Sequence, residues 1–370
     1  MRLLGTFAVC ALLCACASTG PDAPLRLNDI QALASHNSYK RSIDAALFER
    51  MLTDAGPRML ALDYAHPSLA EQLDLGLLKL ELDVFHDPDG GRYAPPAGVA
   101  LLRGLGAPAE PYDAEVMRAP GFKVLHIQDI DFRSQCATFR ICLAQLRDWS
   151  DAHPGHLPIA VSINAKQQAL TTFDAVKPLA FDADAWDVLD GEIIVVLGRE
   201  RLLVPDDVRG EASTLRRAVR RRGWPLLDEV RGRFYFVLDE PMPVLEGYLD
   251  GHPSLVGRAM FAIVPENHPA AAFLILNDPV GQAARIREAV EAGYIVRTRA
   301  DADTREARNG DTTRRDAAFA TGAQFVSTDY YRADPRFKTG YEVRFQGGAT
   351  LRCNPVRRPD PACAAPAAVP

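Results

Sequence analysis

The chain has no excess of positive charge and no apolar run long enough to span a bilayer as a helix. Its 370 residues carry 42 Lys and Arg against 48 Asp and Glu, a net charge of −6, with a pI near 5.8. Nucleic-acid binding requires a basic face, so nucleic acid is not an expected partner. Gly-x-Ser-x-Gly, a Walker loop and His-Glu-x-x-His are also missing. Hydrophobic residues make up 48% of the chain and charged residues 24%, which indicates a folded protein rather than a disordered one.

The N-terminus has the pattern of an export signal. A positive start precedes the apolar run Leu3 to Leu13, which is too short to cross a membrane as a helix. We expect residues 1–16 to be a signal peptide of the lipoprotein type, with lipid on Cys16, and residues 17–26 to be a tether. Simple cleavage near Ala17 is the alternative. Either form is exported, as a periplasmic or outer-membrane-anchored lipoprotein or as a secreted protein.

Cysteine is scarce, and its placement agrees with export. Three of the seven cysteines lie in the signal region, and the others form two close pairs, Cys136 with Cys142 and Cys353 with Cys363. In an oxidising compartment, two local disulfides are expected. The C-x5-C and C-x9-C spacings differ from the C-x2-C of zinc sites. The Pro- and Ala-rich residues 356–370 are expected to form a flexible tail.

Apolar runs of strand length alternate with helical stretches over residues 27–355, which we read as one domain. This alternation predicts a parallel sheet, and eight strands over this length favour a TIM-type (β/α)8 barrel of the α/β class. A doubly wound sheet is the competitor, but Ser35-His36-Asn37-Ser38 is not its Gly-rich first turn. Two further apolar runs, Ile193 to Leu197 and Met260 to Val264, leave the count open. The eight expected strands are Ile30 to Ser35, Leu78 to Phe85, Lys123 to Ile127, Pro158 to Ile163, Phe234 to Leu238, Phe273 to Leu276, Tyr294 to Thr298 and Phe325 to Thr328. The expected helices are Ser68 to Leu75, Ala137 to Ala152, Asp206 to Arg222, Val280 to Ala292 and Thr312 to Thr321.

Carboxylates and amides fall where catalytic groups of a barrel lie, toward the C-terminal ends of strands. Glu81 and Asp83 are two residues apart on a strand, so they point to the same face. Two carboxylates side by side repel each other unless a cation joins them, and hard oxygen ligands suit calcium or magnesium. Asn37 and Asn164 could add neutral oxygens. A solvated surface pair is the alternative, but the apolar neighbours of these acids place the strand in a core.

Two histidines, His36 and His126, end the first and third expected strands. Such a pair suits in-line phosphoryl transfer, with one removing a proton from the attacking hydroxyl and the other acting on the phosphorus oxygens or the leaving group. Taken alone, His126 would more often be a core histidine; its position at a strand end shifts that balance.

Arg297 and Arg299 share a strand face and could grip a phosphate. Ion pairs with Asp301, Asp303 or Asp311 are an equally weighted alternative for these two arginines.

Together these segments resemble the bacterial, calcium-dependent branch of the phosphatidylinositol-specific phospholipase C superfamily. The resemblance rests on Ser35 to Tyr39, Glu81 to Val84, Val124 to His126, Trp149 to Lys166, Gly293 to Asp301 and Val326 to Tyr330. It implies a PLC-like barrel with bound Ca2+ at Asn37, Glu81 and Asp83, and catalysis by His36 and His126. We predict Asn164 as a further Ca2+ ligand, and substrate binding by Lys166, Arg297, Arg299 and Tyr330. One departure is Asn164, which stands where eukaryotic relatives carry a Glu ligand.

The reaction implied by the resemblance is attack of an inositol hydroxyl on the phosphodiester of a phosphoinositide, with release of diacylglycerol. The lipid or its headgroup and a membrane surface are then the expected partners, and a monomer is the expected state. Contact with lipid would come from barrel loops or from lipid on Cys16. Glycerophosphodiester phosphodiesterase is the second enzyme interpretation, although His36-Asn37-Ser38 differs from its His-Arg-Gly. A catalytically inactive, surface-anchored binding lipoprotein is the third.

Overall fold

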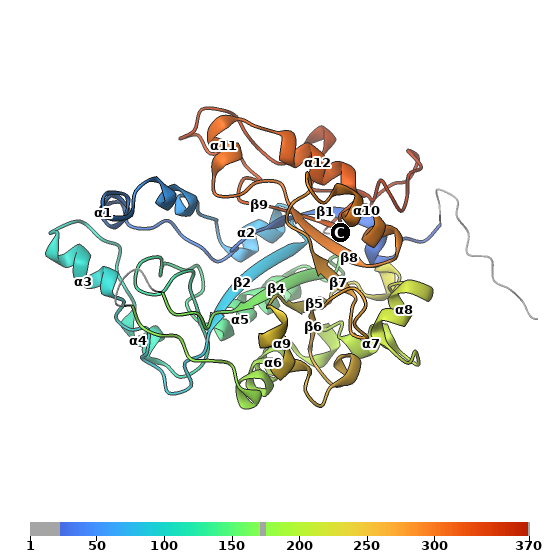
Figure 1. The fold of residues 1–370 in the computed structure, drawn as a ribbon, viewed down its shortest axis with the longest axis horizontal. Helices are drawn as coiled ribbons and strands as arrows, with labels where there is room; N and C mark the ends of the chain where they lie inside the picture. Colours follow the sequence, from blue (N-terminus) through green and yellow to red (C-terminus); the bar gives the residue numbers. More distant parts are fainter. Residues whose placement is uncertain (1–22, 171–174, 369–370) are drawn as a thin grey trace, which may run out of the picture.

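The computed structural model describes residues 23–170 and 175–368. The predicted signal peptide, Cys16 and most of the tether lie outside this part of the chain. Its centre is a ring of parallel strands surrounded by helices (Figure 1). The ring strands are β1 (Ile30–Ser35), β2 (Lys79–Phe85), β4 (Ile159–Ala165), β5 (Phe234–Leu238), β6 (Met260–Ala262), β7 (Phe273–Ile275), β8 (Ile295–Arg299) and β9 (Phe325–Thr328).

Hydrogen bonds join the ring strands in the order β6-β5-β4-β2-β1-β9-β8-β7. One parallel bridge, between Ile263 and Phe273, closes the seam between β6 and β7. Ring strands such as β5 are continuously apolar because both of their faces are covered, whereas β2 and β8 carry charged residues. The predicted TIM-type barrel is therefore confirmed.

Helices cover the outside of the ring. Several begin at the polar caps that the sequence supplies: the Ser68 hydroxyl accepts from the Glu71 N–H before α2, and the Thr138 hydroxyl accepts from the Ile141 N–H before α5. The α-helices are α1 (Ala45–Ala55), α2 (Leu69–Asp74), α3 (Ala97–Gly104), α4 (Ala114–Arg118), α5 (Phe139–Ala152), α6 (Ala183–Leu197), α7 (Pro205–Arg209), α8 (Leu215–Arg221), α9 (Met242–Leu249), α10 (Ala283–Glu291), α11 (Arg305–Asn309) and α12 (Thr313–Thr321). Short 3-10 helices are η1 (Leu27–Asp29), η2 (Pro57–Leu62), η3 (Arg199–Arg201), η4 (Leu227–Glu229), η5 (Pro253–Leu255) and η6 (Gln346–Gly348).

Two expectations for individual segments were wrong, and the open number of strands is resolved. The third expected strand is only β3 (Lys123–Val124), which pairs antiparallel with β2 outside the ring. Met260 to Val264 instead supplies the ring strand β6, and Ile193 to Leu197 is the end of helix α6. The single helix expected over Asp206 to Arg222 is broken into α7 and α8.

The connections after β1 and β2 form a separate layer at the C-terminal end of the barrel. They contain α1, η2, α3 and α4, which Figure 1 shows at one side of the molecule. The layer has its own apolar cluster, centred on Leu47, Met51, Leu102 and Phe132. It extends the rim of the barrel beyond the strand ends.

The C-terminal segment closes the opposite end of the barrel. Strand β10 (Leu351–Cys353) pairs antiparallel with the first half of β1, and the Ala368 carbonyl accepts a hydrogen bond from the Leu157 N–H. The Cys353–Cys363 disulfide links this segment, and Cys136–Cys142 is also formed, so both predicted pairings are confirmed. Residues 356–368, expected as a flexible tail, thus follow the base of the barrel. Among the described residues, no helix has the length and apolarity to cross a membrane.

Candidate active site

A pocket of about 520 Å³ opens at the C-terminal ends of β1, β2, β4 and β5. Seven of the ten predicted site residues line it: His36, Asn37, Glu81, Asp83, His126, Asn164 and Lys166. The parallel strands bring all of them except His126 together because the carboxyl ends of these strands meet at one rim.

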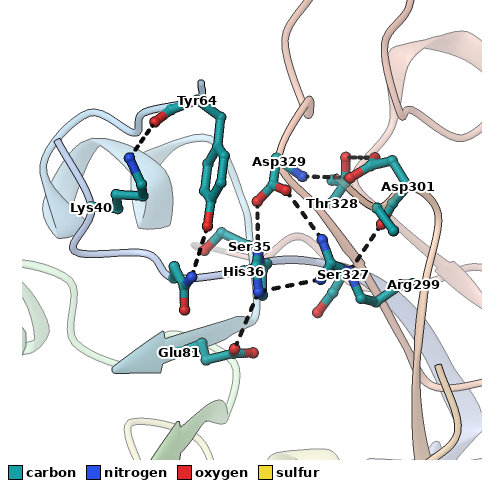
Figure 2. A network of polar contacts seen from close by, with 12 residues as sticks. Ser35, His36, Lys40, Tyr64, Glu81, Arg299, Asp301, Ser327, Thr328 and Asp329 are labelled. Atoms are coloured by element: carbon teal, nitrogen blue, oxygen red, sulfur yellow. Dashed lines mark hydrogen bonds and ion pairs between the residues drawn. The ribbon is translucent and has the colours of Figure 1, made fainter. Parts of the chain in front are cut away.

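His36 follows β1 directly and is fixed through its Nδ1 atom. Nδ1 donates to Asp329 Oδ1 at 2.9 Å, so the neutral ring has Nε2 as its acceptor. Arg299 Nη1 lies 3.3 Å from this Nε2, and Glu81 Oε1 lies 3.8 Å from it (Figure 2). Burial, and then the charge of Arg299, lower the pKa of His36. The ring is therefore held neutral, and in this structure the Nε2 lone pair faces the Arg299 guanidinium.

Asp329 is the charged support beneath His36. It also accepts from Arg299 Nη2 at 3.1 Å. Burial alone would raise the pKa of Asp329, but His36, His66 and Arg299 outweigh burial and hold it well below its usual range. Asp301 lies behind it and accepts from the Asp329 N–H at 2.9 Å. Burial and the Asp329 charge raise the pKa of Asp301 to about 7.

His66 is a member of this network that sequence reasoning missed. Its Nε2 donates to the His36 carbonyl at 2.8 Å and lies 3.6 Å from Asp329 Oδ1, while its Nδ1 accepts from the Tyr331 hydroxyl at 3.0 Å. It thereby fixes the backbone of the residue that enters the pocket. His66 lies in the long connection after β1, where no strand end marks it, so only the tertiary structure reveals its position.

His126 reaches the pocket from a tight hairpin rather than from a ring strand. Ile127 and Asp131 form an antiparallel bridge, and Asp131 Oδ2 accepts from His126 Nδ1 at 2.7 Å. The buried Lys40 lies 3.3 Å from the same oxygen. In both His126 and His36, a carboxylate accepts a hydrogen bond from Nδ1, and Nε2 is the nitrogen on the pocket side.

Tyr64 stands between the two histidines. Its ring centroid is 5.8 Å from that of His36 and 6.5 Å from that of His126. Its hydroxyl accepts from Asn37 Nδ2 at 2.7 Å. This bond leaves the Asn37 carbonyl oxygen as the free acceptor of that amide.

Glu81 is paired with cations on one of its two oxygens. Oε2 accepts from Lys79 Nζ at 2.7 Å and from Arg297 Nη2 at 2.9 Å. Burial would raise the pKa of Glu81, but Lys79 and Arg297 reverse the effect and hold it well below its usual range. Glu81 is therefore a fixed carboxylate with Oε1 turned away from its cations.

Asp83 repeats this arrangement on the same face of β2. Its Oδ2 lies 3.0 Å from Lys166 Nζ. Its Oδ1 accepts from Asn164 Nδ2 at 3.2 Å, and the same nitrogen lies 3.5 Å from Glu81 Oε1. The carboxylate oxygens that face away from the lysines and arginine thus converge on the Asn164 amide.

The donor set at this point fits a hard divalent cation. Within residues 23–170 and 175–368, no three His, Cys, Asp or Glu side chains gather in a way that could hold a metal. The set here has two carboxylates, Glu81 and Asp83, with the amides of Asn37 and Asn164. Rotation of the Asn164 amide would replace its NH2 by oxygen at the same place. Four oxygens of this kind suit calcium, while the nearby Lys79 and Lys166 temper the charge.

Asp239 and Glu240 also line the pocket and were missed. They follow β5 directly, so the strand-end rule applied to Phe234–Leu238 would have found them. Burial raises the pKa of Asp239 to about 6 and that of Glu240 to about 8. Glu240 accepts from the Ala165 N–H at 2.6 Å.

The predicted substrate-binding residues separate into groups. Lys166 lines the pocket. Arg297 is buried beneath Glu81, and Arg299 bridges His36 and Asp329. These partners differ from the carboxylates of Asp301, Asp303 and Asp311, which were the alternative expectation. Only Asp301 among those acids is a contact, through its backbone carbonyl, at 2.9 Å from Arg299 Nε. Tyr330 packs against Phe337 and Tyr341, and lines a different small pocket.

A parallel barrel with paired histidines and carboxylates at its mouth defines a PLC-like TIM-barrel phosphodiesterase. The family model described as "Phosphoinositide phospholipase C, Ca2+-dependent" matches residues 25–355. The chain therefore belongs to the calcium-dependent phosphoinositide phospholipase C family, whose enzymes are phosphoric diester hydrolases. No curated protein sequence matches the chain.

Solved structures agree with this fold. A calcium-dependent phosphoinositol-specific phospholipase C from Pseudomonas sp. matches with a TM-score of 0.53 at 16% identity, covering 89% of this chain and 95% of the other. A calcium-dependent phosphatidylinositol-specific phospholipase C from Streptomyces antibioticus matches with a TM-score of 0.53 at 18% identity, covering 88% and 98%.

Proposed function

We propose that the protein cleaves phosphatidylinositol or a related phosphoinositide by internal transfer. An inositol hydroxyl attacks phosphorus, the new O–P bond closes a cyclic inositol phosphate, and the P–O bond to diacylglycerol breaks. The observation that carries the proposal is the placement of His36 and His126 in one pocket, each with Nδ1 bound to a carboxylate. Two oriented imidazoles can move the two protons that this reaction requires.

His36 is the base in this scheme. A neutral ring with Nδ1–H on Asp329 can accept the hydroxyl proton at Nε2. Asp329 then stabilises the imidazolium that forms. Arg299, whose Nη1 lies 3.3 Å from Nε2, is positioned to receive a phosphate oxygen at the same place.

His126 is then the acid. Its hydrogen bond to Asp131 fixes the ring in the orientation from which it can protonate the diacylglycerol oxygen as it leaves. Lys40, 3.3 Å from the same carboxylate, holds Asp131 in place.

Calcium would be held by the oxygens of Asn37, Glu81, Asp83 and Asn164. When bound there, it would supply neutralisation of phosphate charge and would lower the pKa of a coordinated hydroxyl. Lys79 and Arg297 orient Glu81 from behind, and Lys166 does the same for Asp83. Chelator is expected to suppress turnover, and added calcium to restore it.

Asp239 and Glu240 lie on the β5 side of the same pocket. Carboxyl groups accept hydrogen bonds from ring hydroxyls and disfavour additional phosphates. We therefore favour phosphatidylinositol, with an unphosphorylated ring, over its phosphorylated derivatives.

The test of the catalytic pair compares His36→Ala and His126→Ala with His153→Ala. His153 caps α5 at the other end of the barrel and serves as the matched control. Each catalytic variant should lose about 10²- to 10⁴-fold in kcat, while thermal unfolding and His153→Ala activity stay near wild type. Full turnover in either variant would overturn the two-histidine mechanism. Release of glycerol phosphate in place of cyclic inositol phosphate would favour a glycerophosphodiesterase.

Export is also part of the proposal. Two disulfides suit an oxidising compartment. Mass spectrometry of the mature N-terminus should find lipid on Cys16 or cleavage near Ala17. An intact Met1 in protein from the native host would contradict export by this signal.

A further inference from the structure

A second pocket, of about 580 Å³, lies beside the catalytic pocket. Side chains from α1, η2 and α3 line it, among them Met51, Met59, Leu62 and Leu101. Two residues, Ile127 and Leu170, line both pockets. The two cavities therefore adjoin, and Ile127 is the direct neighbour of His126 in sequence.

The two cavities differ in chemistry. The catalytic pocket presents carboxylates, amides and histidines, whereas the second presents mostly aliphatic and thioether groups. Of its charged lining residues, Arg50 pairs with Asp54 at 2.6 Å, and Asp129 accepts from the Ala97 N–H and the Val176 N–H, each at 2.8 Å. The fourth, Arg58, is exposed. A ligand inside it would meet an apolar wall.

The apolar lining is not explained by the barrel core. It belongs to the layer formed by α1, η2 and α3, whose cluster lies apart from the main core. Leu101 is 37% exposed, and Met59 and Leu62 are half-buried. Unbranched methionines adapt to flexible apolar ligands. Exposed apolar surface that adjoins a polar catalytic pocket marks a binding site.

We propose that this second pocket holds one acyl chain of the diacylglycerol part of the substrate. This inference rests on the proposed function, because a headgroup in the catalytic pocket carries its leaving group toward His126. Ile127, the neighbour of His126 in sequence, lines both pockets and so connects the catalytic pocket to the apolar cavity. The enzyme then recognises a lipid molecule at both ends, the inositol by polar contacts and a chain by burial.

The expected consequence is a dependence on chain length that does not need a membrane. Each CH2 group that enters the pocket should raise kcat/KM about threefold to fourfold, which corresponds to ~0.8 kcal/mol. The rise should stop once the cavity is full. A chain-free headgroup ester should be turned over with a much higher KM.

The experiment uses short-chain diacyl phosphatidylinositols below their critical micelle concentration, and glycerophosphoinositol without chains. Met59→Trp fills the cavity and Leu101→Gln makes its edge polar, while Val195→Gln, at a 75% exposed position on α6, is the control. Both cavity variants should flatten the chain-length dependence and leave turnover of glycerophosphoinositol unchanged. The control should behave as wild type.

A wild-type enzyme that cleaves glycerophosphoinositol and short-chain lipids equally well would overturn the acyl pocket and leave the proposed function standing. A chain effect that appears only above the micelle concentration would also overturn it, and would indicate a membrane-contact surface. No turnover of any inositol substrate would refute the proposed function itself. Binding of a fluorescent fatty acid, lost in Met59→Trp, reports on the pocket without turnover.

Discussion

Asn164→Asp is the substitution that most directly tests the proposed calcium site. The amide nitrogen of Asn164 lies 3.2 Å from Asp83 Oδ1 and 3.5 Å from Glu81 Oε1. A carboxylate in its place removes both contacts and adds a third negative charge at the point where two already converge. Without calcium the variant should be less stable than wild type, and with calcium it should bind the ion more tightly.

The loss without calcium follows from the contacts. A hydrogen bond to a charged group contributes about 1.5–3 kcal/mol, and the contact at 3.5 Å adds little, so ~2–3 kcal/mol is expected with repulsion included. Unfolding entropy of about 2.1 cal/mol/K per residue over 370 residues gives a fall in Tm of about 3–4 °C. Calcium affinity rises with the number of charged ligands, and we expect a tenfold to hundredfold gain, or ~1.4–2.8 kcal/mol.

The assay measures Tm in chelator and across a calcium titration, together with the calcium concentration that gives half-maximal turnover. Asn164→Ala is the control, because it loses the same hydrogen bonds without adding charge. Both variants should lose Tm in chelator, Asn164→Asp more because of its added charge, and only Asn164→Asp should gain more Tm than wild type as calcium is added. An unchanged or smaller calcium response in Asn164→Asp would refute the placement of the ion beside this residue.

Three further predictions concern titration and positioning. The pKa of His36 lies below the ordinary 6.5, so the acidic limb of the pH profile of kcat/KM should lie below pH 6.5. Arg299→Met removes a positive charge that lowers this pKa, so it should move the limb to higher pH. A move to lower pH would contradict the role of His36 as the base. Asp131→Asn should lower kcat with little change in KM because it misplaces His126, and an effect confined to KM would count against that role. The pKa of Glu240 is raised to about 8 in the folded protein. The stability linked to its protonated form is fully present below the pKa of the unfolded chain and is lost as pH rises through about 8. Glu240→Gln should therefore be more stable than wild type at pH 9 by up to a few kcal/mol, at about 1.4 kcal/mol per unit, and should converge with wild type near pH 5; parallel Tm curves would refute this.

Much of the fold could be predicted because most ring strands stand out as apolar runs of strand length. The expected Ile30 to Ser35 and Phe234 to Leu238 match β1 and β5. The prediction failed where an apolar run fits more than one kind of element. Strand β6 has three residues, and Lys123 to Ile127 has an apolar pattern that fits a barrel strand and a hairpin arm equally well.

His126 reaches the catalytic pocket even though Lys123 to Ile127 is not a ring strand, and the topology of β3 explains why. Strand β3 runs antiparallel to β2, pairing Val124 with Val84, so the chain turns back and brings His126 to the pocket that Asp83 lines. The prediction placed His126 at a strand end, and the structure places it on a hairpin held by Asp131. Supporting residues such as His66 could not be found, because they act through contacts between distant segments that no spacing records.

The base of the barrel bears on how the protein would face a membrane. The first described residues enter at the end opposite the pocket, where the Leu227 N–H donates to the Leu25 carbonyl, and Figure 1 shows this end across the molecule from α1 and α3. Lipid on Cys16 would therefore tether the closed end through residues 17–22, whose extended length is at most about 20 Å. An anchored enzyme would point its mouth away from its own anchoring leaflet and would reach lipids of an opposing surface, unless the tether let the barrel roll over.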